Sequence, residues 1–339
     1  MQTVILGATG LEVSRIGFGG IPIQRLTEDE AVRVVKRCLE LGITFFDTAN
    51  SYTTSEERIG KAINGARQRV VLATKTTARD RATAGQHLAL SLKRLNTDYV
   101  DLWQFHNVST QEDYERVLGA DGAMEAALKA RQDGQVLHIG ITSHSMDVAL
   151  KAVRSGYFET IMFPFNFITC EPAEELIPLA AKHNLAFLAM KPFAGGMLDN
   201  ASLAIRYLLS FEHVLPVPGI EKIEEIEEIV EIVARAEPLT EAEREEIERI
   251  RAEVGTRFCR RCDYCQPCPQ GIPISLLMNL RSFWKRFPRD SFTTGWIAEG
   301  VEKARECIEC GSCEEKCPYH LPIREMIKEN ISFYDSVRL

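Results

Sequence analysis

The chain has 339 residues, of which 45% are hydrophobic and 26% are charged. These values are typical of soluble globular proteins and exclude a disordered or collagen-like chain. Forty lysines and arginines stand against 48 aspartates and glutamates, and the resulting net charge of −8 disfavours a nucleic-acid partner. No apolar run reaches the roughly 18 residues that cross a bilayer, and the N-terminus lacks the basic start of a secretory signal. We therefore expect a cytoplasmic protein without a membrane partner.

The first residues, 3–13, contain a glycine-rich turn. The run from Val4 to Gly10 resembles the start of a dinucleotide-binding loop, but Val13 stands where the third glycine would fall. No helical pattern follows this run. A β-hairpin is therefore the favoured interpretation.

Residues 16–235 alternate short β-rich runs with longer amphipathic stretches. The predicted strands are 16–20, 44–48, 70–75, 99–106, 137–142, 160–165, 186–192 and 214–218. The predicted helices are 28–41, 55–63, 82–95, 123–132, 146–153, 172–183, 201–210 and 222–234. This alternation predicts an α/β protein with a (β/α)8 TIM barrel. A doubly wound open sheet, which usually has fewer units, is the alternative.

A further helix is predicted after the barrel. Thr240 with Glu243 forms a capping box, so a helix should run to about Val254. In the acidic stretch 221–253, isoleucine and valine recur every three or four residues, which favours two solvated amphipathic helices over an acidic binding tail. The composition changes at Arg257. We therefore predict a barrel domain over residues 1–255 and a second domain over 256–339.

Eight of the ten cysteines lie in two short runs of the second domain. Three thiolates spaced two residues apart can surround one face of an iron–sulfur cubane, and in two-cluster ferredoxins the cysteine before proline binds the other cluster. The second run matches this ferredoxin pattern fully, whereas the first is one residue short before its Cys-Pro. We therefore expect a mostly helical, ferredoxin-like domain with two [4Fe–4S] clusters, one on Cys259, Cys262, Cys265 and Cys317, the other on Cys268, Cys307, Cys310 and Cys313.

Zinc and disulfides are the alternatives for these cysteines. Zinc ribbons typically use paired Cys-x2-Cys knuckles and not runs of four cysteines that end in Cys-Pro. Disulfide frameworks belong to exported chains, and no export signal is evident here. The remaining two cysteines, Cys38 and Cys170, are expected to be plain buried thiols.

Four polar residues follow three neighbouring strands of the predicted barrel. Asp47 ends the second strand, Tyr52 lies in the loop after it, Lys75 ends the third strand and His106 the fourth. TIM-barrel active sites lie at these strand ends. A phenol with a pKa near 10 is a poor acid, but a close ammonium stabilises its phenolate and lowers that pKa. Asp47 would hold Lys75, and His106 would orient a bound carbonyl oxygen.

The segments around these residues carry a family resemblance. They are Phe45-Phe46-Asp47-Thr48-Ala49, Ser51-Tyr52, Ala73-Thr74-Lys75, the run 95–102, Phe105-His106 and the run 139–143. From about residue 3 to 254 the chain resembles the aldo-keto reductases, and with the cysteine-rich segment it resembles their bacterial and archaeal iron–sulfur subgroup. The resemblance implies that NADPH or NADH gives a hydride to an aldehyde or ketone. It also implies Tyr52 as general acid, tuned by Asp47 and Lys75, with His106 positioning the substrate.

The match is poorer where the family binds its cofactor. The family's carboxamide-binding Ser-Asn pair reads Ser143-His144, and the family's glutamine aligns with Met162. Glu225 stands where a basic residue would meet the 2′-phosphate of NADP, so we lean away from a strict NADPH preference, although Lys222 could compensate. Separately, the glycine-rich loop after the seventh strand is a typical phosphate site of such barrels. The candidate cofactor-binding residues are Ser143, His144, Asn166, Met190, Lys191, Pro192, Gly195, Gly219, Glu225 and Glu228.

Three functions are compatible with these features. The first is a nicotinamide-dependent carbonyl reductase with a small carbonyl substrate, whose clusters are structural or serve a distant electron-transfer protein. The second is an electron-transfer oxidoreductase, which needs a flavin or an external ferredoxin because clusters move single electrons and nicotinamide moves a hydride. No motif indicates a flavin. The third, a non-catalytic redox sensor, is disfavoured because all four residues of the tetrad are present.

Overall fold

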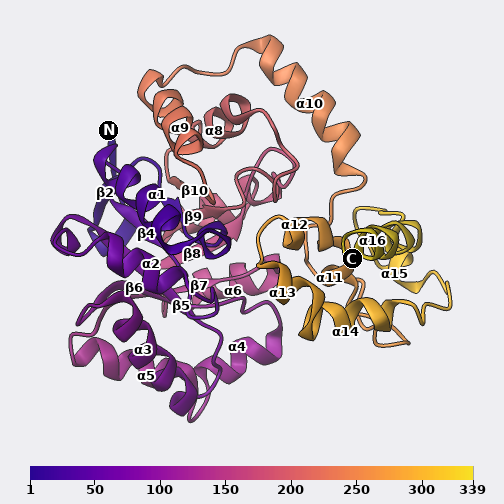
Figure 1. Cartoon of the computed structure of the whole chain (residues 1–339), viewed down its shortest axis with the longest axis horizontal. Coiled ribbons are helices and arrows are strands. Elements are labelled where there is room, and N and C mark those ends of the chain that lie inside the picture. Colours follow the sequence, from indigo (N-terminus) through magenta and orange to yellow (C-terminus); the bar gives the residue numbers. More distant parts are fainter. Residues whose placement is uncertain (339) are drawn as a thin grey trace. The chain divides into compact units, whose positions relative to one another are not determined.

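The computed structural model describes residues 1–338 and contains two compact units, the first Met1–Leu239 and the second beginning at Thr240 (Figure 1). Helix α10 (Glu241–Gly255) starts the second unit, with Thr240 and Glu243 forming the expected capping box. The division between the units therefore precedes this helix, whereas the domain boundary predicted from composition follows it.

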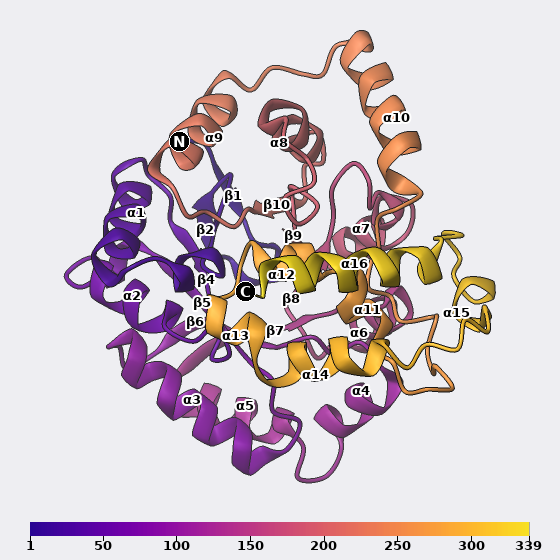
Figure 2. The same ribbon diagram turned by 45° about the vertical axis from the view of Figure 1, so that its right-hand side comes forward.

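The first unit is an eight-stranded barrel with helices around it (Figure 2). All neighbouring strands are parallel and follow the chain order β3 to β10. Their bounds are β3 (Phe18–Gly19), β4 (Phe45–Asp47), β5 (Val71–Thr76), β6 (Val100–Phe105), β7 (Val136–Thr142), β8 (Thr160–Pro164), β9 (Ala186–Met190) and β10 (Val214–Val217). The Gly19 N–H donates to the Pro218 carbonyl at 2.7 Å, and Gly19 bridges Gly219 in parallel, which joins the two ends of the sheet. The predicted (β/α)8 barrel is confirmed.

The closing seam requires glycine. A Cβ on Gly19 would lie 2.7 Å from the Pro218 carbonyl oxygen, closer than a side chain tolerates. Barrel closure also explains why the strands are so apolar: their outer sides pack against the helices and their inner sides fill the barrel, as the buried Phe45, Leu102 and Leu188 do.

The helices follow the predicted alternation. Their bounds are α1 (Glu28–Glu40), α2 (Ser55–Ala62), α3 (Arg81–Leu95), α4 (Gln111–Leu118), α5 (Ala123–Gln132), α6 (Met146–Ser155), α7 (Leu176–Lys182), α8 (Ala201–Leu209) and α9 (Ile223–Arg235). The single helix predicted over 172–183 is two pieces, a 3-10 turn (Glu171–Ala173) and α7, and Pro178 lies in the first turn of α7, where proline is tolerated. Helix α4 was not predicted; it begins where the Thr110 hydroxyl accepts the Asp113 N–H at 3.1 Å.

The N-terminal hairpin is confirmed. Strand β1 (Thr3–Ile5) pairs antiparallel with β2 (Glu12–Ser14), and a 3-10 turn (Gly7–Thr9) connects them. The Ala8 N–H donates to the carbonyl of Asn184, just before β9, so the hairpin lies at the N-terminal end of the strands. Leu6 and Val13 extend the packing inside the barrel. The opposite, carboxyl end of the strands carries the residues of the candidate site.

The second unit is mostly helical, as predicted. After α10 it contains α11 (Ile274–Met278), α12 (Leu280–Trp284), α13 (Arg289–Thr293), α14 (Gly295–Ala304), α15 (Ser312–Glu315) and α16 (Ile323–Val337). Its core combines aliphatic and aromatic side chains with the buried Cys317, and five further cysteines pack against that core. Within residues 1–338, no helix combines the length and the apolar character needed to cross a membrane.

Candidate active site and cysteine pockets

Asp47 and Lys75 form a buried ion pair at the ends of two neighbouring strands, β4 and β5. The Lys75 ammonium donates to Asp47 Oδ2 at 2.5 Å and to the Thr48 carbonyl at 2.7 Å, and its side chain is 1% exposed. Gln104, on β6, donates to Asp47 Oδ1 at 3.1 Å. Three adjacent strands therefore fix both charges, and neither Thr48 nor Gln104 was expected to take part.

The charges of this pair are set by burial and by each other. Burial raises the pKa of the Asp47 carboxyl, against the opposing effects of Lys75 and Gln104. Burial alone would lower the pKa of the Lys75 ammonium, but the charge of Asp47 and the phenol of Tyr52, each with a hydrogen bond, outweigh burial and raise it. Lys75 is therefore a cation at neutral pH, held beside the Tyr52 phenol.

Tyr52 lies in the turn between β4 and α2 and contacts both Lys75 and His106. Lys75 Nζ is 5.0 Å from the centroid of the Tyr52 ring. The Tyr52 and His106 rings meet edge to face, with centroids 5.6 Å apart and an interplanar angle of 81°. The phenol is half-buried. The structure therefore brings all four predicted residues together at one end of the barrel.

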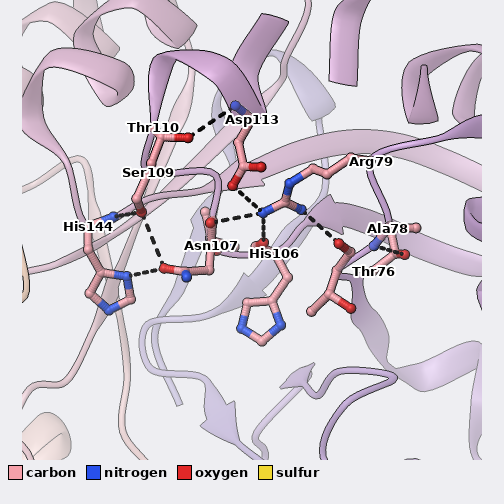
Figure 3. Close-up of polar contacts among 11 residues, drawn as sticks. Thr76, Ala78, Arg79, His106, Asn107, Ser109, Thr110, Asp113 and His144 are labelled. Carbon is pink, nitrogen blue, oxygen red and sulfur yellow. Dashed lines mark hydrogen bonds and ion pairs between the residues drawn. The ribbon is translucent and has the colours of Figure 1, made fainter. Parts of the chain in front are cut away.

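The chain turns sharply after His106, and Arg79 holds this turn (Figure 3). Arg79, in the loop after β5, donates from Nη2 to the carbonyls of His106 and Asn107, each at 3.0 Å, and to Asp113 Oδ2 at 3.1 Å. From the other side, the Asn107 amide oxygen lies 2.8 Å from His144 Nδ1. Sequence patterns gave no indication of Arg79 or Asp113, because their contacts depend on loops from different strands.

The eight clustered cysteines line two pockets of the second unit, four in each. One pocket is lined by Cys259, Cys262, Cys265 and Cys317, and the other by Cys268, Cys307, Cys310 and Cys313. Ile274, at the start of α11, lines both. In each pocket a cysteine of one run, Cys317 or Cys268, joins three of the other run. The structure thus assembles the same two sets of four that the sequence pattern predicts.

The two pockets differ in exposure. Cys317 is 7% exposed in the first, whereas Cys310 in the second is an exposed residue next to Ile308, which is 62% exposed. None of the ten cysteines, all within residues 1–338, forms a disulfide. Within residues 1–338, no three or more histidine, cysteine or acidic side chains are gathered closely enough for a single metal ion. Of the two other cysteines, Cys38 is fully buried in α1, where burial raises its pKa to about 12, and Cys170 is half-buried.

Comparisons with known proteins identify both units. Residues 15–203, more than half of the chain, match the aldo/keto reductase family. The chain belongs to the aldo/keto reductase family. Residues 258–322 match the 4Fe-4S dicluster domain, a segment that contains all eight clustered cysteines. Both predicted resemblances are confirmed.

Several relatives of this aldo/keto reductase are matched over about two thirds of their own length. An uncharacterized oxidoreductase of Bacillus subtilis, YqkF, is 30% identical over 212 residues, which are 58% of this chain and 67% of the relative. L-galactose dehydrogenase of Arabidopsis thaliana is 30% identical over 218 residues, covering 58% of this chain and 66% of the relative. The holo form of AKR11C1 from Bacillus halodurans superposes with a TM-score of 0.66 at 29% identity, covering 74% of this chain and 96% of its own.

A further neighbour is an aldo-keto reductase of Klebsiella pneumoniae whose structure is a complex with NADPH. It superposes with a TM-score of 0.63 at 22% identity and covers 74% of this chain and 94% of its own. At this identity the likeness concerns the fold, and the barrel is therefore one that other proteins use to bind NADPH.

In this aldo/keto reductase, the residues predicted near the nicotinamide make contacts of their own. The Ser143 hydroxyl bonds the backbone of Ser145, the N-cap of α6. The His144 N–H donates to Ser109 Oγ at 2.9 Å. Asn166 is fully buried; its amide donates to the Lys191 carbonyl and its oxygen accepts the N–H groups of residues 168 and 169. These side chains shape the ends of β7 and β8, and their predicted contact with a cofactor stays a prediction.

The loop after β9 has an unusual backbone. Met190 and Lys191 are half-buried and Pro192 is buried, and Lys191, Ala194 and Gly195 have φ values of +59°, +47° and +77°. Two turn hydrogen bonds, from Ala194 N–H to the Lys191 carbonyl and from Gly196 N–H to the Phe193 carbonyl, close this loop on itself.

The residues predicted near the adenosine end lie around the start of α9. The Glu225 carboxylate accepts the backbone N–H groups of Glu221 and Lys222, at 2.9 and 3.1 Å, and so caps the helix. Glu228 is exposed on the same helix, and Gly219 is the partner of Gly19 in the closing seam. The carboxylate of Glu225 already occupies donors of this helix N-terminus.

Proposed function

We propose that the chain is a nicotinamide-dependent reductase of aldehydes or ketones, with Tyr52 as the general acid. The observation that carries this proposal is the contact of Tyr52 with both Lys75 and His106, while Asp47 binds Lys75. A bound nicotinamide supplies the hydride, which adds to the carbonyl carbon. The remaining requirement is one proton at the carbonyl oxygen, and this chain must deliver it.

The chain's own residues account for that proton. Tyr52 donates its hydroxyl proton as the C=O bond becomes C–OH, and the ammonium of Lys75 stabilises the phenolate that remains. Asp47 is an acceptor that keeps Lys75 charged and in place. The His106 imidazole, at the edge of the Tyr52 ring, orients the carbonyl oxygen beside the phenol. Solvent then returns the proton to Tyr52, which is half-buried and not sealed.

The nucleotide proposal is that NADH and NADPH are both accepted. The capping role of Glu225 supports it, because a carboxylate at the start of α9 would repel a 2′-phosphate that approached the same N–H groups. Lys222 is exposed beside it and would offset part of this repulsion.

The second unit is proposed to hold two [4Fe–4S] clusters. Its two pockets fit them, because each is lined by four cysteines from both runs, none of them in a disulfide, amid apolar side chains. Cys259, Cys262, Cys265 and Cys317 would hold one cluster, and the second set would hold the other. We further propose that these clusters exchange single electrons with a protein partner, and the exposure of Cys310 supports the second pocket as the point of exchange.

The test of carbonyl reduction compares two tyrosine variants. NADH and NADPH oxidation is followed with a panel of aldehydes and ketones. Tyr52→Phe should reduce kcat by about 100-fold or more, since general acid catalysis contributes that much. Tyr157→Phe, a tyrosine that is 58% exposed, is the matched control and should retain full activity. Equal rates for the Tyr52→Phe and wild-type proteins would refute the assignment.

The clusters are tested on protein purified without oxygen. Iron analysis should give about eight atoms per chain, and visible absorption should report the clusters. A result of about four irons would mean that one cysteine set does not hold a cluster. Bound flavin in the same spectrum would instead favour the electron-transfer alternative.

A further inference from the structure

The segment that follows His106 is held by side chains from two other loops. Arg79 reaches it from the loop after β5, and its side chain is 18% exposed. The backbone of Arg79 is itself fixed, because its carbonyl accepts the Ala123 N–H at 3.0 Å. One side chain thereby connects the strand that carries Lys75 with the strand that carries His106.

The geometry of the turn explains why an arginine is needed. Asn107 has a φ of +54°, in the left-handed region that few residues other than glycine and asparagine adopt. Arg79 Nη2 donates to the carbonyls of His106 and Asn107, and Nη1 donates to the Thr77 carbonyl at 3.1 Å. The guanidinium reaches these acceptors from two nitrogen atoms in a fixed plane, whereas a lysine would have to serve them all from one nitrogen.

The same turn is held from the β7 side. The Asn107 N–H donates to Thr142 Oγ1 at 2.7 Å. The Asn107 amide oxygen faces His144 Nδ1 at 2.8 Å (Figure 3). Asp113, at the start of α4, balances the charge of Arg79 at 3.1 Å. The residue next to His106 is therefore anchored on both sides, and Arg79 is the charged anchor.

We propose that Arg79 is a positioning residue that fixes the backbone of His106 and thereby aims its imidazole at the Tyr52 ring. Once the backbone is fixed, the two side-chain torsions of His106 and the contact of its Nδ1 with Ser51 Oγ, at 3.4 Å, decide where the imidazole meets the Tyr52 ring. This inference rests on the proposed function, because it assigns the catalytic consequence of the contact to carbonyl reduction. The positioning itself is a structural claim and is tested separately.

The first experiment measures kinetics in a double-mutant cycle. Arg79→Met should lower kcat by about 10- to 100-fold, because small misplacements of a reacting group cost that much. NADH affinity, measured by quenching of protein fluorescence, should change less than about twofold. In a His106→Ala background the same substitution should lower kcat less than about twofold, since the group that Arg79 positions is absent. An equal loss in both backgrounds would overturn the proposal.

Two further variants separate positioning from folding. Arg81→Met removes an exposed arginine two residues away, paired with Glu125, and should leave kcat and the midpoint of thermal unfolding unchanged. Arg79→Lys keeps the positive charge but loses the two-nitrogen donor geometry of the guanidinium. The kcat of this variant should therefore lie between those of Arg79→Met and the wild type. If Arg79→Met does not fold, the cycle is run with Arg79→Lys, with the same outcomes expected at smaller amplitude.

The second experiment needs no activity. The chain has seven histidines, so long-range nitrogen–proton spectra of protein labelled at the histidine rings are tractable. The His106 signals are assigned by their loss in His106→Ala. Arg79→Met or Arg79→Lys should shift or broaden them, while the signals of His213 stay in place. Unmoved His106 signals would overturn the positioning claim even if carbonyl reduction is established, whereas moved signals in an inactive protein would refute only the proposed function.

Discussion

Lys75→Met should test the charge network most directly, first through stability. The substitution removes the ammonium that lies 2.5 Å from the Asp47 carboxylate. Asp47, which is 4% exposed, then keeps only the hydrogen bond from the Gln104 amide. Breaking one partner out of a buried ion pair costs about 3–5 kcal/mol of unfolding free energy. Asp47→Asn with Lys75→Met removes both charges, so the double variant should recover much of that loss.

The pH dependence of this loss has a defined sign. Burial raises the pKa of Asp47 in the folded state, and removing the ammonium raises it further. When the pKa of Asp47 is higher in the folded state than its unfolded value of about 3.9, protonation at low pH stabilises the folded state. This stabilisation is lost as the pH rises through the folded pKa. The stability deficit of Lys75→Met should therefore be smaller at pH 5 than at pH 8.

The catalytic effect follows from the distance between Lys75 and Tyr52. A charge 5.0 Å from the ring centroid interacts with a phenolate by about 3 kcal/mol at an effective dielectric constant of about 20. This energy equals about two pH units. Lys75→Met should therefore move the alkaline limb of the kcat/KM profile for carbonyl reduction upward by about two units and lower the rate at pH 7 by about 100-fold.

The assay is the pH profile of nicotinamide oxidation, with chemical unfolding measured on the same samples. Lys61→Met is the matched control: the Lys61 side chain, in α2, is 56% exposed and forms an ion pair with Glu28. This control should leave the pH profile of kcat/KM in place. It should change the free energy of unfolding by no more than about 0.5 kcal/mol. An alkaline limb that does not move in Lys75→Met would refute the assigned role of the ammonium, whatever the stability result.

Three further predictions concern other parts of the chain. Glu225→Gln keeps a hydrogen-bonding cap at the start of α9 but removes the negative charge. The ratio of the NADPH Kd to the NADH Kd, measured by fluorescence, should therefore fall about 2- to 5-fold. An unchanged ratio would mean that the 2′-phosphate binds elsewhere. Burial disfavours the Glu159 carboxylate, but hydrogen bonds from His138 and the Ile139 N–H, together with nearby charges, lower the pKa of Glu159. The ionised carboxylate therefore stabilises the fold at pH values above the ordinary pKa of a glutamate, and this stabilisation is lost as the pH falls. Glu159→Gln should therefore cost about 1 kcal/mol at pH 7 and progressively less below pH 4, by chemical unfolding; a constant cost would contradict this. An iron chelator should remove about four irons quickly, from the pocket with the exposed Cys310, and about four slowly, from the pocket with the buried Cys317. Cys310→Ser should abolish the fast phase and Cys317→Ser the slow phase. A single phase in the wild type would contradict the difference in exposure.

The sequence by itself determined the barrel and the cysteine sets. Alternating β-rich and amphipathic runs specify a parallel barrel because buried parallel strands must be apolar and each needs a helix to return the chain. A hairpin was favoured over a dinucleotide-binding loop for residues 3–13 because position 13 is valine, whereas such a loop has its third glycine there. The four residues of the tetrad were found because parallel strands end on one side of a barrel. The two sets of four cysteines were predicted from the spacing of the two runs.

The tertiary structure decided everything that depends on loops from different strands meeting. Helix α4 and the clamp on the turn after His106 escaped prediction because Arg79, Asn107 and Asp113 lie up to 34 positions apart and have no period that links them. Gln104 looked like any polar residue in a strand until β6 was placed beside Asp47. The cap formed by Glu225 was equally invisible beside its acidic neighbours. Local patterns specify elements, whereas hydrogen bonds between loops are fixed only when the barrel closes.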